Sequence, residues 1–373
     1  MPFLASFGGG SARGFNPGGS GFDWGQFSTG DVYQGGYMRV INSTTLQWWF
    51  YPTQRTNGQT QQGSTITSTV TLEGAADIKC HVFGGGGGGS GTNGSGGGGG
   101  GFASTTSAAT LGSGQLISFG AGSAGLGGVA QNVDGLNNVN YLGDSTGNPN
   151  NKNTDGGTSY ISFGVGGSSL YLQALGGTGK QVVNPSSYSD CGQGGTGTVI
   201  SNTLGLTTLV GSGGDGGSRN LSGVSAVGGG GGGGNNNASG GLDKGGNSTK
   251  AGGGGGGSGN GQTPSSSQNG GGAGGTYGFT GGLGGDTDTN IFGYQGTDLY
   301  TDVSNTLPIG AGYAYQNSDN TGWGLGTILG RGSAGGGGFP GGGGGSSYYG
   351  GGISNFGVGG DGASGAVMLE ISF

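Results

Sequence analysis

The chain has 373 residues, of which 112 are glycine and only 7% are charged, and this composition excludes an ordinary globular core beneath a charged surface. Its 14 tyrosines, 15 phenylalanines and 4 tryptophans distinguish it from disordered low-complexity chains, which are poor in aromatic residues. A net charge of −7 with scattered Lys and Arg residues argues against nucleic-acid binding, and no apolar run is long enough for a signal peptide or for insertion into a membrane.

An N-terminal stretch, residues 1–37, sets aromatic residues among glycines and shows neither helical nor strand periodicity. Such a segment cannot build a core alone, so we expect an extended assembly arm that docks its rings into another chain. The residues expected to make this contact are Phe15, Phe22, Trp24 and Phe27. Deleting the arm should then leave the rest of the chain folded.

The next stretch, residues 38–64, begins with MRVINSTTLQWWFYP, in which β-branched and aromatic residues predict strands. We expect it to form a β connector between the arm and the rest of the chain. Its aromatic run, residues 48–51, is expected to be exposed, and contiguous exposed aromatic side chains favour a contact between copies. The sequence therefore predicts a homo-oligomer.

The remaining region, residues 65–373, begins with the strand TITSTVTL and continues with the opening strand DIKCHVF at 77–83. In the opening strand, apolar residues alternate with Lys79 and His81, which predicts one buried face and one face in water. The chain closes on AVMLEISF at 366–373, which alternates in the same way. We expect the opening and closing strands to pair, because that pairing encloses everything between them as one domain.

Polyglycine tracts dominate the region between these two strands. They cover residues 84–89, 96–101, 228–234, 252–257, 335–338 and 341–345. A polyproline-II helix has three residues per turn and no internal hydrogen bonds, and only glycine lets such helices approach closely enough to bond laterally. We therefore expect a mostly β and irregular fold, in which antiparallel strands close a sandwich of polyglycine-II helices with essentially no α-helix.

Segments rich in Asn, Asp and Tyr separate the tracts, notably residues 131–155 and 286–320, and carry the chemistry of turns. Because glycine helices present no side chains, we expect recognition to reside in these loops. Aromatic rings among amides and carboxylates suit a glycan or an exposed protein loop. The residues expected to recognise it are Phe292, Tyr294, Tyr300, Tyr313, Tyr315 and Trp323. Packing between chains is the alternative role for each of them.

The sequence contains no constellation typical of catalysis or metal binding. The one histidine, His81, is expected on the solvent face of its strand. Cys80 and Cys191 are expected to be two small buried residues in preference to a disulfide. The string GGTGKQ departs from a phosphate loop, because Gln181 replaces the required Ser or Thr. We therefore expect no enzymatic activity, no catalytic residue, no metal and no cofactor.

The order of these features resembles a known type of protein. A strand ending in Val-Phe breaks directly into polyglycine (HVFGGGGGGSG), a second tract follows (GSGGGGGGFAS), and the chain ends on SGAVMLEI and two further residues. This pattern is similar to the glycine-rich domain of phage tail and virion proteins, and to the distal tail-fibre adhesins of T-even-like phages. The resemblance covers about residues 65–373 and is compositional more than positional.

The resemblance implies a virion-surface protein, a tail fibre or fibre-tip adhesin, whose loops bind a host surface glycan or an outer-membrane protein. Other virion proteins would then be the partners of the N-terminal arm, and analogy with fibres favours a trimer. A purely structural virion component, such as a capsid decoration or tail-connecting protein, is the first alternative. A bacterial extracellular glycine-rich surface protein is the second.

Overall fold

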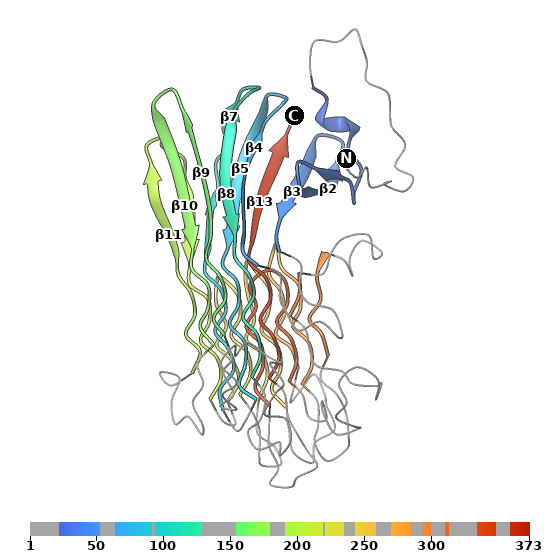
Figure 1. Cartoon of the computed structure of the whole chain (residues 1–373), viewed down its shortest axis with the longest axis vertical. Helices are drawn as coiled ribbons and strands as arrows, with labels where there is room; N and C mark the ends of the chain where they lie inside the picture. The colour runs from blue at the N-terminus through green and yellow to red at the C-terminus, as the bar shows by residue number, and fades with distance from the viewer. Residues whose placement is uncertain are drawn as a thin grey trace, which may run out of the picture.

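The computed structural model of the chain describes residues 22–52, 64–91, 94–128, 154–179, 191–218, 221–234, 243–258, 270–284, 294–299, 310–312, 334–347 and 359–373. Figure 1 shows strands at one end of the long axis and, continuing from them, side-by-side segments that are not drawn as strands. In this part of the chain the named elements are β-strands and one 3₁₀ turn, Trp24–Gln26, and neighbouring strands pair antiparallel. For the described residues, the expected fold class, mostly antiparallel β with essentially no α-helix, is confirmed.

The strands form two sheets. The eight-stranded sheet has the order β1 (Val32–Tyr33), β2 (Gly36–Asn42), β3 (Thr45–Phe50), β13 (Ala366–Ser372), β5 (Ala76–Phe83), β6 (Phe102–Thr105) and β12 (Thr208–Gly211), with β7 (Ala109–Leu111) also paired to β5. The five-stranded sheet has the order β11 (Gly197–Asn202), β10 (Ser168–Ala174), β9 (Ser159–Val165), β8 (Leu116–Ala121) and β4 (Ile66–Thr71).

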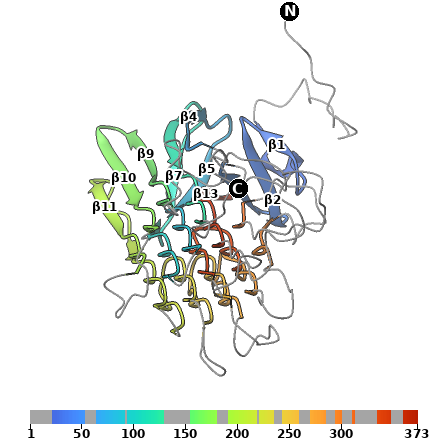
Figure 2. The ribbon, with the colours of Figure 1, turned by 60° about the horizontal axis from the view of Figure 1, so that its bottom comes forward.

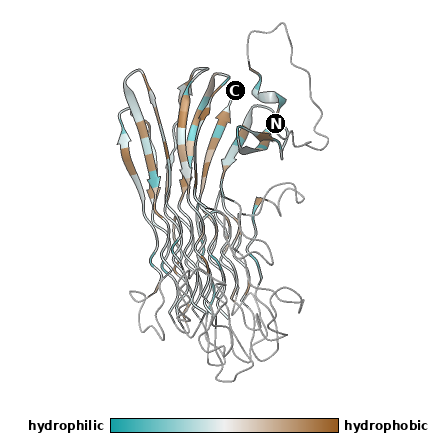
Figure 3. Cartoon of the chain, in the orientation of Figure 1, coloured by the Kyte–Doolittle hydropathy of each residue, from teal (hydrophilic) through white to brown (hydrophobic). Residues whose placement is uncertain are grey.

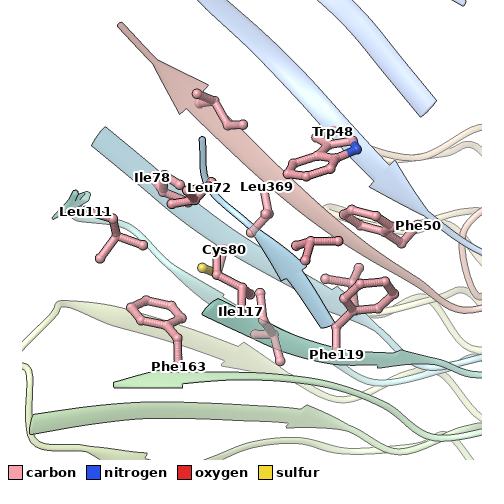
Figure 4. Close-up of a cluster of buried hydrophobic side chains, with 14 of the residues drawn as sticks. Trp48, Phe50, Leu72, Ile78, Cys80, Leu111, Ile117, Phe119, Phe163 and Leu369 are labelled. Carbon is pink, nitrogen blue, oxygen red and sulfur yellow. The ribbon is translucent and has the colours of Figure 1, made fainter. Parts of the chain in front are cut away.

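One apolar core lies between the two sheets. The strands alternate hydrophobic and hydrophilic residues in Figure 3, as half-buried strands do. Trp48 and Leu369 from the larger sheet and Phe119 and Phe163 from the smaller one meet in this core, as Figure 4 shows. The core therefore belongs to the strand end of the molecule, and the glycine-rich end is built without it.

The predicted pairing of the opening and closing strands is confirmed. β13 lies between β3 and β5, and its residues pair antiparallel with β5 from Ala366 opposite Phe83 to Ser372 opposite Asp77. The last strand of the chain is thus a central strand of the larger sheet. It fixes the two ends of the glycine-rich region next to each other.

Below the strands, glycine-rich stretches run side by side; we call them the glycine segments. They comprise residues 84–90, 95–101, 122–128, 154–158, 175–179, 192–196, 212–218, 222–226, 228–234, 244–248, 251–258, 270–275, 280–284, 294–298, 334–339, 341–347 and 359–365. Figure 2, in which the lower end of the bundle is turned toward the viewer, shows the segments as regularly repeating turns that lie in neighbouring layers. Most of their residues are buried although they have no side chains to bury, because segments cover one another.

Hydrogen bonds between the glycine segments repeat every three residues. In segment 84–90, the N–H groups of Gly84 and Gly87 donate to one neighbouring segment, 95–101. The next residue of each triplet donates to a second neighbour, 154–158, and the third residue donates to 359–365. A period of three is the helical repeat of the polyproline-II conformation, and it sends bonds in three directions around one segment.

Carbonyl groups complete the arrangement around the same segment. The carbonyl oxygens of residues 85–87 and of Gly89 accept bonds from three further segments, 122–128, 175–179 and 341–347. Segment 84–90 is therefore enclosed by six others, and all of its N–H groups and most of its carbonyl groups are satisfied by lateral bonds. A Cβ atom on Gly86 would overlap the carbonyl oxygen of Gly342, so the segments approach closely only because the side chain is absent.

The expectation for residues 38–64 needs correction. The described part is no connector, because β2 and β3 belong to the larger sheet and β3 pairs with β13. The aromatic run is not exposed either: Trp48 and Phe50 join the core between the sheets, while Trp49 and Tyr51 contact Phe339 on the other side. Burial on both faces removes the physical argument that this run drives oligomerisation.

The expectation for the N-terminal arm is also wrong in its described part. Trp24 is 2% exposed and belongs to the core of its own chain, with Phe22 and Phe27 packed against it. The physical reason is a cluster of rings: Trp24 lies 4.8 Å from Phe22 and 6.1 Å from Trp48, measured between ring centroids. Residues 22–37 are thus part of the fold, and Phe15 lies outside the described residues.

The substitution Trp24→Ala should test this correction. We expect it to lower the free energy of unfolding by about 3–5 kcal/mol, because it removes a buried indole and leaves a cavity beside Trp48. Urea unfolding measures the loss. Val32→Ala is the matched control, since Val32 is 57% exposed, and should change stability by less than about 0.5 kcal/mol. Equal losses of unfolding free energy from the two substitutions would contradict the burial of Trp24 and would support a detachable arm at residues 22–37.

His81 is buried and not on a solvent face. It is 3% exposed, neither ring nitrogen has a hydrogen-bond partner, and its ring centroid lies 4.5 Å from that of Tyr277. The reason is tertiary: the turn that carries Tyr277 connects two glycine segments and covers this end of the sheet. On this face of β5, Lys79 and not His81 reaches solvent, and the Lys79 ammonium pairs with the Glu370 carboxylate at 3.1 Å.

Candidate functional site: the distal end of the glycine segments

The glycine segments end at a common level away from the strands, which we call the distal end (Figure 1). Lateral bonds define it: Ser90 N–H donates to Ser95 O, Ser347 N–H donates to Ser90 O, and Ser258 N–H donates to the carbonyl oxygen of residue 346. Nearby, Gly359 N–H donates to the carbonyl oxygen of residue 128. Residues from widely separated parts of the sequence are thereby fixed in one plane.

Serine side chains hold this plane together. Ser346 and Ser347 are fully buried, and their hydroxyl groups donate to the carbonyl oxygens of Gly94 and Gly91 at 3.2 and 2.8 Å. These carbonyls lie where segments 84–90 and 95–101 end and a glycine neighbour is lacking. The hydroxyls therefore take over bonds that the backbone no longer provides, and they stop the ends of the segments from fraying.

Aspartate carboxylates also connect neighbouring segments, as hydrogen-bond acceptors; we call these contacts clips. Asp155, Asp215 and Asp361 each accept a backbone N–H through Oδ1 at 2.8 Å, from Gly179, Gly194 and Gly127 respectively. Each aspartate is followed by glycine in the sequence. These bonds were not predicted from the sequence, although the recurring Asp-Gly pair is a signal that could have indicated them. A carboxylate that accepts N–H bonds stabilises the segment beside it more strongly than a neutral group does.

Asp243 is the exception among these aspartates. It lies at the distal end, where its backbone carbonyl accepts the N–H of Gly257, and its side chain is fully buried. Neither carboxyl oxygen has a hydrogen-bond partner. Burial consequently raises the pKa of this carboxyl to about 8, which means that the folded chain favours the protonated form at neutral pH.

The substitution Asp243→Asn should therefore stabilise the chain in a pH-dependent way. An acid whose folded pKa is raised contributes stability below its unfolded pKa of 3.8, and this contribution is lost as the pH rises toward 8. We expect equal stability of variant and wild type near pH 4, and a gain of about 4–5 kcal/mol for the variant near pH 8. Denaturant unfolding at both pH values measures this difference.

Asp155→Asn is the matched control, because Asp155 already accepts an N–H bond at 2.8 Å. Its substitution should give no stabilisation at either pH, since it weakens a charge-assisted hydrogen bond. A constant gap between Asp243→Asn and wild type at pH 4 and pH 8 would contradict the raised pKa.

Most of the residues expected to recognise a partner lie outside the described residues. They are Phe292, Tyr300, Tyr313, Tyr315 and Trp323. Tyr294 is described: it is 49% exposed, and its N–H donates to Leu283 O at the distal end. The other expected recognition segment, residues 131–155, is described only at Thr154 and Asp155, which are both bonded to the neighbouring segments.

The described part of the aromatic-rich segment that begins at residue 286 includes residues 294–299, whose two ends lie far apart. Tyr294 marks the distal end, whereas Leu299, five residues later, is buried in a cluster with Trp49 and Phe339 at the strand end. Asp298 is 1% exposed and accepts N–H bonds from Gly310 and from the residue after it, at 2.9 and 3.2 Å. Residues 294–299 therefore run from the distal end to the strand end of the bundle.

Other stretches are anchored at the distal end on both sides. Their bounding residues bond to each other or to adjacent segments at this level, for example Thr154 N–H to Leu126 O and Thr178 N–H to Gln193 O. The intervals bounded in this way are residues 129–153, 180–190, 235–242, 259–269, 285–293 and 348–358. Six intervals that are far apart in the sequence thus begin and end at the distal end. We call this common set of segment ends the platform.

The described residues provide no catalytic arrangement. His81 is far from the platform, and desolvation together with the charges of Lys79 and Lys250 lowers its pKa to about 3. Cys80 and Cys191 are buried and form no disulfide, as expected, and burial raises the pKa of the Cys80 thiol to about 12. Within the described ranges, no three His, Cys, Asp or Glu side chains gather as a metal site, and no helix is long and apolar enough to cross a membrane.

Comparison with known proteins identifies no family for this chain. No protein-family model matches the sequence, and no curated protein matches it significantly.

Proposed function

We propose that this chain is a virion-surface protein of a bacteriophage, a tail-fibre or fibre-tip adhesin, which binds a host surface receptor through loops on a glycine scaffold. The observation that carries the proposal is the platform, because intervals of up to 25 residues begin and end at one end of a laterally bonded bundle. Segments carried on such a support are where binding functions concentrate. The proposed role is binding and not catalysis.

We further infer that the glycine segments are polyglycine-II helices. The three-residue period of lateral bonds and the six neighbours of segment 84–90 support this inference. A scaffold of this kind presents almost no side chains along its length. It can therefore supply position and rigidity while leaving specificity to the segments at its ends.

The proposed partner is a host surface glycan or an exposed loop of an outer-membrane protein. Attachment to other virion proteins is proposed only for residues 1–21, which include Phe15, because residues 22–37 pack on the chain itself. A homo-oligomer, with a trimer first, is proposed by analogy with fibres alone. The proposed location is the surface of the virion, without insertion into a membrane and without nucleic acid as a ligand.

Adsorption to bacteria tests this function. We would label the purified chain fluorescently, measure its binding to a panel of bacterial strains, and then replace residues 129–153 and 348–358 with Gly-Ser sequences of equal length. We expect wild type to bind at least one strain and the replaced chain to lose that binding. The melting temperature should be nearly unchanged, because both intervals begin and end on the platform.

The matched control replaces the turn at 112–114, which lies at the opposite end of the molecule beside β8. This control should retain binding. Equal binding by the chain with replaced loops would overturn the assignment of recognition to the distal end. A chain that enters phage particles but adsorbs to no strain would favour the purely structural virion component, whether capsid decoration or tail connector.

A further inference from the structure

The outer face of the five-stranded sheet carries no charged side chain. None of its strands, β4, β8, β9, β10 and β11, contains Asp, Glu, Lys, Arg or His. The outer face of the larger sheet, by contrast, carries Lys79 paired with Glu370. Exposed sheet surfaces usually carry charges, which keep them soluble and separate. On a chain of net charge −7, an exposed sheet face without charges is therefore unusual, and a ligand that contacts this face would explain it.

Hydroxyl groups form a row across this face. The register of the strands places Thr69, Ser118, Ser162, Tyr171 and Ser201 next to one another, one residue from each strand. Neighbouring strands lie about 4.8 Å apart, so the row spans about 19 Å. The hydroxyl oxygens of Thr69 and Ser118 lie 3.1 Å apart, which shows that side chains of the row reach one another. Such groups both donate and accept hydrogen bonds.

Tyr171 of the row and a second tyrosine, Tyr160, place two aromatic rings on this face. Tyr160 lies over Gly120, where a Cβ atom would come within 2.5 Å of the ring. Tyr171 meets Tyr160 edge to face, with ring centroids 6.0 Å apart and planes at 71°. Both side chains are half-buried, so each ring is held in place and still keeps a surface toward solvent. A fixed aromatic surface next to hydroxyls offers apolar contact and hydrogen bonding at low cost in conformational entropy.

A shallow depression of about 660 Å³ overlies this part of the face. Its lining includes Ser118, Ser162, Tyr171 and Ser201 of the row, together with Gln115 and Ser169. Ser169 contacts Ser201 through their hydroxyl oxygens at 2.9 Å. The depression therefore combines neutral polar groups from four strands with one aromatic wall, and it lies at the end of the molecule away from the platform (Figure 1).

We propose that this face binds a neutral linear oligosaccharide, laid across the strands along the hydroxyl row. Electrostatics select the ligand, because a face without charged partners leaves an ionised group of a ligand uncompensated. The hydroxyls of a sugar chain pair with those of the row, and the apolar side of a sugar ring packs on Tyr171. This site is separate from the distal platform and does not rest on the proposed role in host adsorption.

Isothermal titration calorimetry of the full chain tests the site. The probes are cellohexaose, maltohexaose and mannohexaose as neutral chains, with hexagalacturonate as the charged counterpart. We expect at least one neutral hexaose to bind with a Kd below about 1 mM, and hexagalacturonate to bind at least about tenfold more weakly. Failure of all three neutral chains to bind at millimolar concentration would overturn the proposal, as would preferred binding of hexagalacturonate.

Two substitutions locate the site. Tyr171→Ala should weaken binding of the neutral hexaose at least about fivefold, because it removes the aromatic wall. Ser162→Lys places a charge in the middle of the row and should weaken binding similarly; it decides the question if Tyr171→Ala fails to fold. Val32→Ala, on β1 at the edge of the larger sheet, is the control: Val32 is 57% exposed and lies outside both proposed sites, so this variant should bind like wild type.

An outcome in which Ser162→Lys binds as wild type does would place the sugar elsewhere and overturn the proposal. Analytical ultracentrifugation adds a further test. A wild-type dimer that Ser162→Lys converts to a monomer would show that a second copy of the chain covers this face, and the oligosaccharide proposal would then be wrong.

Discussion

Replacing Gly97 by alanine should destabilise the chain by at least about 4 kcal/mol, or prevent folding altogether. The methyl group would overlap the carbonyl oxygen of Gly87 in the neighbouring segment, and backbone atoms on both sides fix that contact. The N–H of Gly97 also donates to Gly344 O, and its carbonyl accepts the N–H of Gly232. A shift that relieves one clash therefore breaks bonds to other segments. Thermal and denaturant unfolding measure the loss.

Gly112→Ala is the matched control for this substitution. Gly112 is exposed, and a Cβ atom there meets nothing within 4 Å. The same chemical change should consequently alter stability by no more than about 0.5 kcal/mol. If Gly97→Ala were tolerated as well as Gly112→Ala, the close approach of the glycine segments would be wrong.

Acid should destabilise the chain through its one histidine. His81 has a pKa lowered from 6.5 to about 3, because burial disfavours the charged ring and the charges of Lys79 and Lys250 oppose it further. Below pH 6.5 the histidine is protonated in the unfolded chain but stays neutral in the folded chain. The contribution of His81 to the free energy of unfolding is therefore present above pH 6.5 and is lost as the pH falls toward 3. The shift corresponds to about 4–5 kcal/mol across this range.

The substitution His81→Leu isolates this effect, because it keeps a similar volume and cannot titrate. The difference in unfolding free energy between the variant and wild type should grow by about 4–5 kcal/mol from pH 7 to pH 3. Asp243 titrates in both proteins, so its opposite pH dependence cancels in this difference. Measurements at pH 8, where the histidine is neutral in both states, serve as the control. A difference independent of pH would mean that His81 is hydrated or paired in solution.

Strand positions were readable from the sequence where alternation was local. The pairing of residues 77–83 with 366–373 followed from two alternating apolar patterns and is confirmed by the register of β5 with β13. The near-absence of α-helix followed from the glycine content, and the described residues contain no named α-helix. Both inferences depend on properties of short stretches, which a single sequence shows directly.

Burial by distant residues was not readable. The solvent face expected for His81 is covered by Tyr277, which lies almost two hundred positions further along the chain. Trp24 was expected to seek another chain, yet its partner Trp48 belongs to the same one. Nothing in a local pattern states which face a later turn will cover, because glycine segments return repeatedly to the same sheet.

The candidate site was predictable only in outline. Recognition on loops between glycine tracts stays a prediction, and Tyr294 is the one expected recognition residue that the structure describes at the platform. The clips made by Asp155, Asp215 and Asp361 were missed, although each precedes a glycine in the sequence. They were overlooked because a carboxylate in a glycine-rich stretch looks like a solvated loop residue until its neighbouring segment is known.

Amide hydrogen exchange on a chain labelled with ¹⁵N-glycine tests the central claim most directly, namely that the glycine segments form an ordered, laterally bonded bundle. The N–H groups of residues 84–89 and 96–101 each donate to a backbone carbonyl of another segment, so we predict slow exchange of these amides, governed by global unfolding. The exposed amide of Gly166 in the β9–β10 turn should exchange rapidly and serves as the internal reference. Exchange of residues 84–89 as fast as that of Gly166 would contradict the account.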